Sequence, residues 1–129
     1  MTATTKGARR PRHLNLLRIR LPLPGLVSIL HRISGCLLAL ASPWFFWALE
    51  RALSSEFAFN NARAAFSSAP VQVIALLMLW ALLHHLLAGI RLLLLDFGIG
   101  EELRTARVSS WLALILAGAP VALLASRLL

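Results

Sequence analysis

His85 is the residue whose surroundings most clearly require a chemical partner. It lies inside an apolar run, Val71 to Leu95, that is long enough to cross a lipid bilayer. An imidazole in hydrocarbon is costly unless something bonds to its nitrogens, so a histidine at this depth is a functional-site candidate. The partner could be a metal ion, a proton-exchanging group or the iron of a haem. Zinc is disfavoured because it takes three or four ligands, and the adjacent His84 points in another direction along a helix.

A second set of polar residues interrupts another apolar segment, in the stretch Ser28 to Gly35. At about 100° per residue, Ser28, Arg32 and Gly35 fall on one helix face, with His31 to the side. The small Gly35 permits the close approach of a neighbouring helix or of a flat ligand. This stretch therefore combines hydrogen-bonding groups and a cation with space for a ligand.

Gly89 lies one helical turn beyond His85 on the same face, and its missing side chain leaves room for a wide planar ring. An axial haem ligand needs this arrangement, with a free imidazole nitrogen and nothing that collides with the macrocycle. His31 and Arg32 are then placed to neutralise the haem propionates. The pattern makes haem ligation by His85 the leading hypothesis.

Simpler interpretations of the same residues remain open. A membrane histidine often forms only an interhelical hydrogen bond, and His84 could be the ligand in place of His85. Arg32 could extend its cation to the membrane surface without any ligand. Acidic residues in a loop, such as Glu102, are most simply solvated charges.

The elements that must position these residues are three transmembrane helices. The chain has 129 residues, of which 59% are apolar, against about 45–50% in a typical soluble domain. The apolar residues are concentrated in three blocks, which excludes an ordinary soluble core. We predict an all-α, three-helix membrane bundle with spans at about Leu26 to Leu49, Pro70 to Leu95 and Ser110 to Leu128. Residues 21–25 are expected to be extended or turning, and Gly98 is expected to end the second span.

The charge distribution predicts the orientation of these spans. Six of the thirteen Lys and Arg residues precede residue 21, and the net charge is +8. Beside transmembrane spans, such a basic segment marks the cytoplasmic end of the first helix better than it marks a nucleic-acid-binding tail. We therefore predict a basic cytoplasmic segment over residues 1–25 and an anchor domain over residues 26–129. The N-terminus is expected in the cytoplasm and the C-terminus on the outer side.

Several short motifs in this sequence are similar to those of a known family. The chain resembles the cytochrome b556 subunits of succinate dehydrogenase, which are membrane anchors of respiratory complex II, from about residue 10 to residue 128. The resemblance is carried by Arg10-Pro11, by the stretch Ser28 to Gly35, by His85 with Gly89-Ile90-Arg91, and by Asp96-Phe97-Gly98. One departure is Leu92, where many members of the family have a histidine.

The resemblance implies a haem b shared between two anchor subunits. His85 occupies the position of one axial ligand, and the second anchor subunit supplies the other. His31 and Arg32 match residues near the haem propionates. The remaining partners implied are an iron–sulfur subunit and a flavoprotein subunit, which carry the iron–sulfur clusters and the FAD, in the cytoplasmic (inner) membrane of a bacterium.

The resemblance also implies a site for ubiquinone. Ser28 and Arg32 match residues that line the quinone pocket beside the iron–sulfur subunit, and Asp96 and Glu102 match carboxylates that would feed protons to it. The chain is then a component of an enzyme, not an enzyme alone. Two alternatives are a haem-b anchor of a quinol:fumarate reductase and, from a different class, a small transporter or assembly protein.

Overall fold

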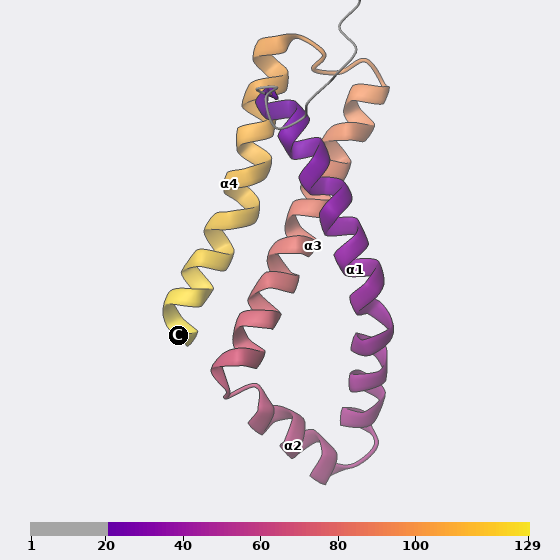
Figure 1. The fold of residues 1–129 in the computed structure, drawn as a ribbon, viewed down its shortest axis with the longest axis vertical. Helices are drawn as coiled ribbons and strands as arrows, with labels where there is room; N and C mark the ends of the chain where they lie inside the picture. Colours follow the sequence, from indigo (N-terminus) through magenta and orange to yellow (C-terminus); the bar gives the residue numbers. More distant parts are fainter. Residues whose placement is uncertain (1–20) are drawn as a thin grey trace, which may run out of the picture.

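The protein is all-helical over residues 21–129, the part of the chain that the computed structural model describes. Figure 1 shows the four helices in order, which are α1 (Leu23–Leu53), α2 (Glu56–Ala65), α3 (Ala69–Asp96) and α4 (Leu103–Leu128). Three of them, α1, α3 and α4, are long and apolar enough to cross a membrane. The predicted all-α bundle with three spans is therefore confirmed. Most of the predicted basic segment, residues 1–20, lies outside the described residues, and the direction of the spans stays a prediction.

Two helices begin several residues earlier in the sequence than predicted. The α1 helix starts at Leu23, so the extended or turning segment predicted over residues 21–25 is wrong from that residue onward. Pro24 is tolerated because the first turn of a helix has no partner for its N–H groups, and the amide of Gly25 donates to the carbonyl of Pro22 at 2.9 Å. The α4 helix starts at Leu103 and not at Ser110, because the polar turn before the apolar block is itself helical.

The connection between α1 and α3 contains the short helix α2, which was not predicted. The side chain of Ser55 accepts a hydrogen bond from the amide of Ala58 at 3.1 Å, which caps the start of α2. Glu56 in the first turn complements the positive end of the helix dipole. The α2 helix packs on α1 and runs across the ends of α1 and α3 in Figure 1.

The connection between α3 and α4 confirms the prediction that Gly98 ends the second span. Gly98 has a φ of 74°, a conformation that favours glycine. Its amide donates to the carbonyl of Leu95 and the amide of Ile99 donates to that of Leu94, both at 2.9 Å. This pair of bonds is the Schellman motif, which turns the chain sharply out of a helix. We call the end of the bundle that carries this connection the junction end.

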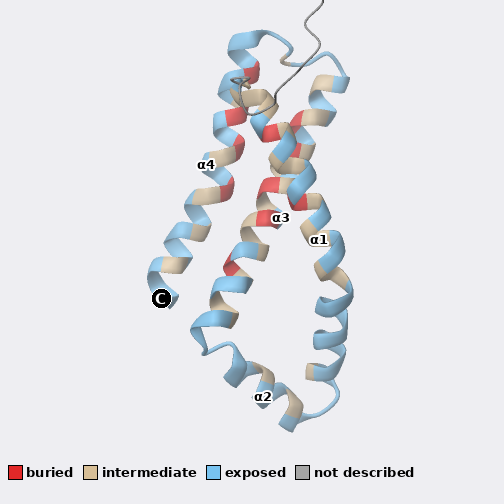
Figure 2. Ribbon diagram, viewed as in Figure 1, coloured by how far each residue is buried: buried red, intermediate tan, exposed pale blue. Residues whose placement is uncertain are grey.

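Most of the core of the bundle lies nearer to the junction end than to α2. Figure 2 shows buried residues in the half of the bundle where α1, α3 and α4 come together, and further buried residues along α3 toward α2, where α1 and α3 diverge. Small side chains dominate this core and let the helices approach closely. On α4 the buried residues recur at helical spacing, as Ala106, Ser110, Ala113 and Ala117. On α3 they are Leu76, Ala81, His84, Ala88 and Arg91.

Candidate functional site

His85 of α3 is held by the backbone of α1. Its Nδ1 lies 3.0 Å from the carbonyl oxygen of His31. Because a carbonyl oxygen only accepts hydrogen bonds, Nδ1 carries the proton and donates it. In the neutral ring, Nε2 is then the nitrogen with a free lone pair. Within residues 21–129, Nε2 has no hydrogen-bond partner, so this lone pair is available to an external partner.

The position of the His85 ring depends on Gly35. A Cβ atom at Gly35 would lie 2.7 Å from Cε1 of His85, which is closer than two carbon atoms approach without displacement, and 3.2 Å from its Nδ1. Beside it, the buried Ser34 donates to the carbonyl of His31 at 2.9 Å, and its Oγ lies 3.4 Å from Nδ1 of His85. Gly35 thus provides the space for the ring, and the helical turn before it provides the acceptor.

His31 packs on His85 in a reciprocal arrangement. The two imidazole rings are stacked, with centroids 4.1 Å apart and planes 8° from parallel. Nε2 of His31 lies 3.2 Å from the place that a Cβ of Gly89 would take. The space at Gly89, which the sequence predicts to admit a planar ligand, is therefore filled by the ring of His31. Each helix provides a glycine that admits the histidine of the other, and this pairing was missed from the sequence.

His84 lies in a different environment from His85. Its side chain is fully buried, and neither ring nitrogen has a hydrogen-bond partner among the described residues. The ring stacks on Trp80 with centroids 5.3 Å apart. A side chain that binds an external group must be reachable from outside this chain, and His84 is not. His85 is only partly buried, so of these two histidines it is the one that an external group can reach.

Ser28 and Arg32 lie one turn apart on α1, on either side of His31 in the sequence. Ser28 is partly buried and the guanidinium-bearing Arg32 is exposed. Neither side chain forms a hydrogen bond or an ion pair with another of the residues 21–129. Both are thus free to contact a ligand or a partner subunit near the histidine pair.

Asp96 and Glu102 lie away from this group. Asp96 is the last residue of α3 and Glu102 directly precedes α4, and both are exposed at the junction end. Asp96 lies about 16 Å along the helix from His85, at eleven residues of rise. The structure therefore brings His31 and His85 together beside Ser28 and Arg32, and it leaves the two carboxylates outside this group.

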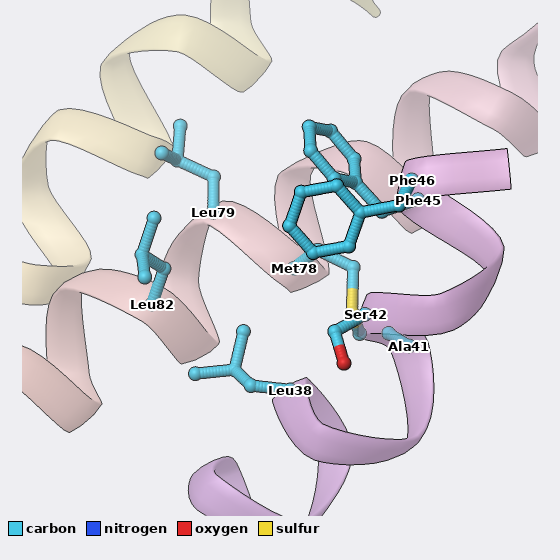
Figure 3. Close-up of a pocket in the computed structure, with 8 residues that line it drawn as sticks. All are labelled: Leu38, Ala41, Ser42, Phe45, Phe46, Met78, Leu79 and Leu82. Carbon is cyan, nitrogen blue, oxygen red and sulfur yellow. The ribbon is translucent and has the colours of Figure 1, made fainter. Parts of the chain in front are cut away.

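A cavity of about 400 Å³ lies between α1 and α3 on the side toward α2. Figure 3 shows Phe45 and Phe46 from α1 close to this space, with Leu79 and Leu82 from α3. Ser42 is the one polar residue of its lining. Because the lining has no titratable group, this cavity is not a candidate for proton or metal chemistry.

Two features of this site fit a bound haem. A histidine that binds a metal commonly donates its other N–H to a backbone carbonyl, which fixes the orientation of the ring. His85 has this bond to the carbonyl of His31. The exposed cation of Arg32 lies on the next residue of α1 and suits the carboxylates of a porphyrin. The residues present therefore fit an axially ligated haem iron.

Comparison with known proteins identifies a family that the chain matches over most of its length. Residues 6–124 match the family described as succinate dehydrogenase/fumarate reductase transmembrane subunit. The chain is 36% identical over 120 residues to the succinate dehydrogenase cytochrome b556 subunit of Coxiella burnetii, covering 87% of this chain and 96% of the relative. It is 37% identical over 108 residues to the subunit of the same name from Paracoccus denitrificans, covering 84% and 83% of the two chains.

Proposed function

Because this chain belongs to the succinate dehydrogenase/fumarate reductase transmembrane subunit family, we propose that it anchors a succinate:ubiquinone oxidoreductase in a bacterial cytoplasmic membrane. In this role it contributes one axial ligand to a haem b and part of the site where ubiquinone is reduced. The direction of succinate oxidation is supported by the names of the two relatives, which are both succinate dehydrogenase subunits. The names of these relatives also include cytochrome b556, which supports the haem.

The observation that carries this proposal is the 3.0 Å contact between Nδ1 of His85 and the carbonyl oxygen of His31. The Nδ1–H of His85 donates to this carbonyl, so Nε2 presents a lone pair to a haem iron. His31 and Arg32 provide positive charge or hydrogen bonds for the propionates. A haem bound here would store an electron close to the quinone site. The second ligand of such a haem would come from a second hydrophobic anchor subunit, a partner that the family of this chain supports.

The quinone site is proposed at Ser28 and Arg32. The hydroxyl of Ser28 would donate a hydrogen bond to one carbonyl oxygen of ubiquinone. The exposed guanidinium of Arg32 would stabilise the negative charge that develops on this oxygen during reduction, as other preorganised donors stabilise an oxyanion. Both residues lie in the first turns of α1. With the N-terminus in the cytoplasm, they face the side where the iron–sulfur subunit and the flavoprotein subunit dock.

Asp96 and Glu102 are proposed to feed protons to this site from the cytoplasm. Both carboxylates are exposed at the junction end, where α1 begins and α3 ends. Neither forms an ion pair within residues 21–129, so each is free to exchange protons with solvent. In this proposal the two carboxylates would act at the cytoplasmic mouth of the proton route, and Ser28 and Arg32 would contact the quinone.

The close approach at Gly35 provides a test of the His85 geometry. We expect Gly35→Ala to displace the His85 ring from the carbonyl of His31, because the added Cβ would lie 2.7 Å from Cε1. The assembled complex should then contain markedly less haem b for each flavin. Gly118→Ala is the matched control, since a Cβ at Gly118 meets no atom within 4 Å. Equal haem content in the two variants would refute this role of Gly35.

The proposed function as a whole is tested by the reduced-minus-oxidised spectrum of the complete complex. The chain should be co-expressed and purified with its partner subunits. Addition of succinate is expected to produce the absorbance bands of a reduced b-type haem, and ubiquinone is expected to reoxidise them. A complex with all subunits that shows no haem bands would contradict the proposal.

A further inference from the structure

Arg91 is a buried cation without a counter-charge in the part of the chain that the structure describes. Its side chain is 7% exposed. The Nε–H donates to Oγ of Ser109 at 3.0 Å, and an Nη2–H donates to the carbonyl of Ala106 at 3.4 Å. Both acceptors are neutral, and the guanidinium has five N–H donors in all. A buried charge is costly unless it is paired, so we expect an anion to bind to this guanidinium.

Arg91 opens onto a groove between α3 and α4. The groove encloses about 380 Å³. Its other walls are mainly aliphatic, with Leu87 and Ile90 from α3 and Leu112 and Leu116 from α4. Leu112 and Leu116 are more than half exposed. The lining extends on α4 from Thr105 to Leu116, about 16 Å of helix, which suits a hydrocarbon chain lying along the bundle.

Arg91 lies near the end of α3. It lies five residues before Asp96, where α3 ends, at about 7 Å of helical rise. Arg side chains this close to the end of a membrane helix can extend toward lipid phosphates. The carboxylates nearest in the sequence, Asp96, Glu101 and Glu102, are exposed, and none of them is bonded to Arg91.

We propose that this groove binds an anionic phospholipid, with its phosphate on Arg91 and an acyl chain along Leu112 and Leu116. Arginine binds phosphate oxygens through several parallel hydrogen bonds, and the free N–H groups of Arg91 allow this. Ser109 orients the guanidinium from α4. The site lies on a different face of α3 from His85, which is six residues away and therefore turned by about 120°. The lipid site does not depend on the proposed haem and quinone roles.

The lipid site is tested on the complete complex in nanodiscs of phosphatidylcholine with a minor fraction of phosphatidylglycerol. Native mass spectrometry of the released complex measures the phosphatidylglycerol that stays bound. Arg91→Gln is expected to lower the apparent affinity for this lipid roughly tenfold, the loss of one or two charge-assisted hydrogen bonds. Arg107→Gln is the matched control, because it removes the same charge from the exposed surface at the same end of the bundle.

A second variant tests the groove without changing Arg91. Leu112→Trp fills the groove from an exposed position on α4, so it should displace the acyl chain while the subunits still assemble. The proposal fails if the wild-type complex is not enriched in phosphatidylglycerol. It also fails if Leu112→Trp retains as much of this lipid as Arg107→Gln, which would mean that a partner subunit covers the groove. Haem absorbance should be unchanged in Leu112→Trp, so a failure here is distinguishable from a failure of the haem proposal.

Discussion

Replacement of His85 by alanine is expected to leave the assembled complex without haem b absorbance. The substitution removes the nitrogen that the backbone of α1 orients, and a haem held from one side by the second anchor subunit lacks its other axial bond. Loss of the ring also removes the stacking partner of His31. The measurement is the pyridine haemochrome content of the purified complex relative to its flavin, which is expected to fall to about a tenth of the wild-type value or less, because loss of a ligand is at least as severe as loss of a group that orients one.

The adjacent histidine provides the control for this prediction. His84→Leu removes two buried nitrogens that have no partner within residues 21–129, and it keeps an apolar side chain in the core. This variant is expected to keep its haem. A complex that loses haem with His84→Leu and retains it with His85→Ala would reverse the assignment of the ligand.

Replacement of Arg32 by alanine is expected to separate the two activities of the complex. Reduction of ubiquinone by succinate should fall roughly a hundredfold, the effect of removing one preorganised donor from a developing oxyanion. Reduction of a soluble dye by succinate should not change, because the dye takes its electrons from the soluble subunits. The measurement is the steady-state rate of succinate oxidation with ubiquinone and with the dye, on the same preparation.

A variant of a second arginine, Arg104, is the control for this prediction. Arg104→Ala removes an exposed cation from α4 at the junction end. This variant should leave both rates unchanged. An equal loss of both activities in Arg32→Ala would point to failed assembly, and no loss of either would remove Arg32 from the quinone site.

The spans could be predicted from the sequence because hydropathy and length decide them almost alone. Their ends could not, because hydropathy does not register the polar turn of α4 that begins at Leu103 or the first turn of α1 around Pro24. The short helix α2 was missed for a related reason. It has ten residues and lies in a nearly neutral connection, so its main signal is the single cap at Ser55.

The candidate site was only partly predictable from the sequence. A histidine inside an apolar span indicated His85 directly, whereas its bond to the carbonyl of His31 depends on how α1 and α3 align. A signal for this alignment is nevertheless present in the sequence. In both helices a glycine follows the histidine after four residues, as His31 with Gly35 and His85 with Gly89. In antiparallel helices, this repeated spacing lets each glycine receive the ring of the opposite histidine.

The contacts of Arg91 could not be predicted from the sequence. Its motif marked it as a polar residue near the end of the second span, but its bonds to Ser109 and to the carbonyl of Ala106 required the packing of α4. Ser109 was expected to lie in the connection before the third span, and it is instead part of a helix. The groove on this side of α3 therefore became visible only in three dimensions.

The most direct test of the central claim is the near-infrared magnetic circular dichroism of the oxidised complex, which reports the two axial ligands of a low-spin haem. The wild-type complex is expected to give the charge-transfer band of two imidazoles. His85→Met is expected to move this band to the position of a histidine–methionine pair. An unchanged bis-imidazole band in His85→Met would show that the iron is held by another residue, and the account of the site would be wrong.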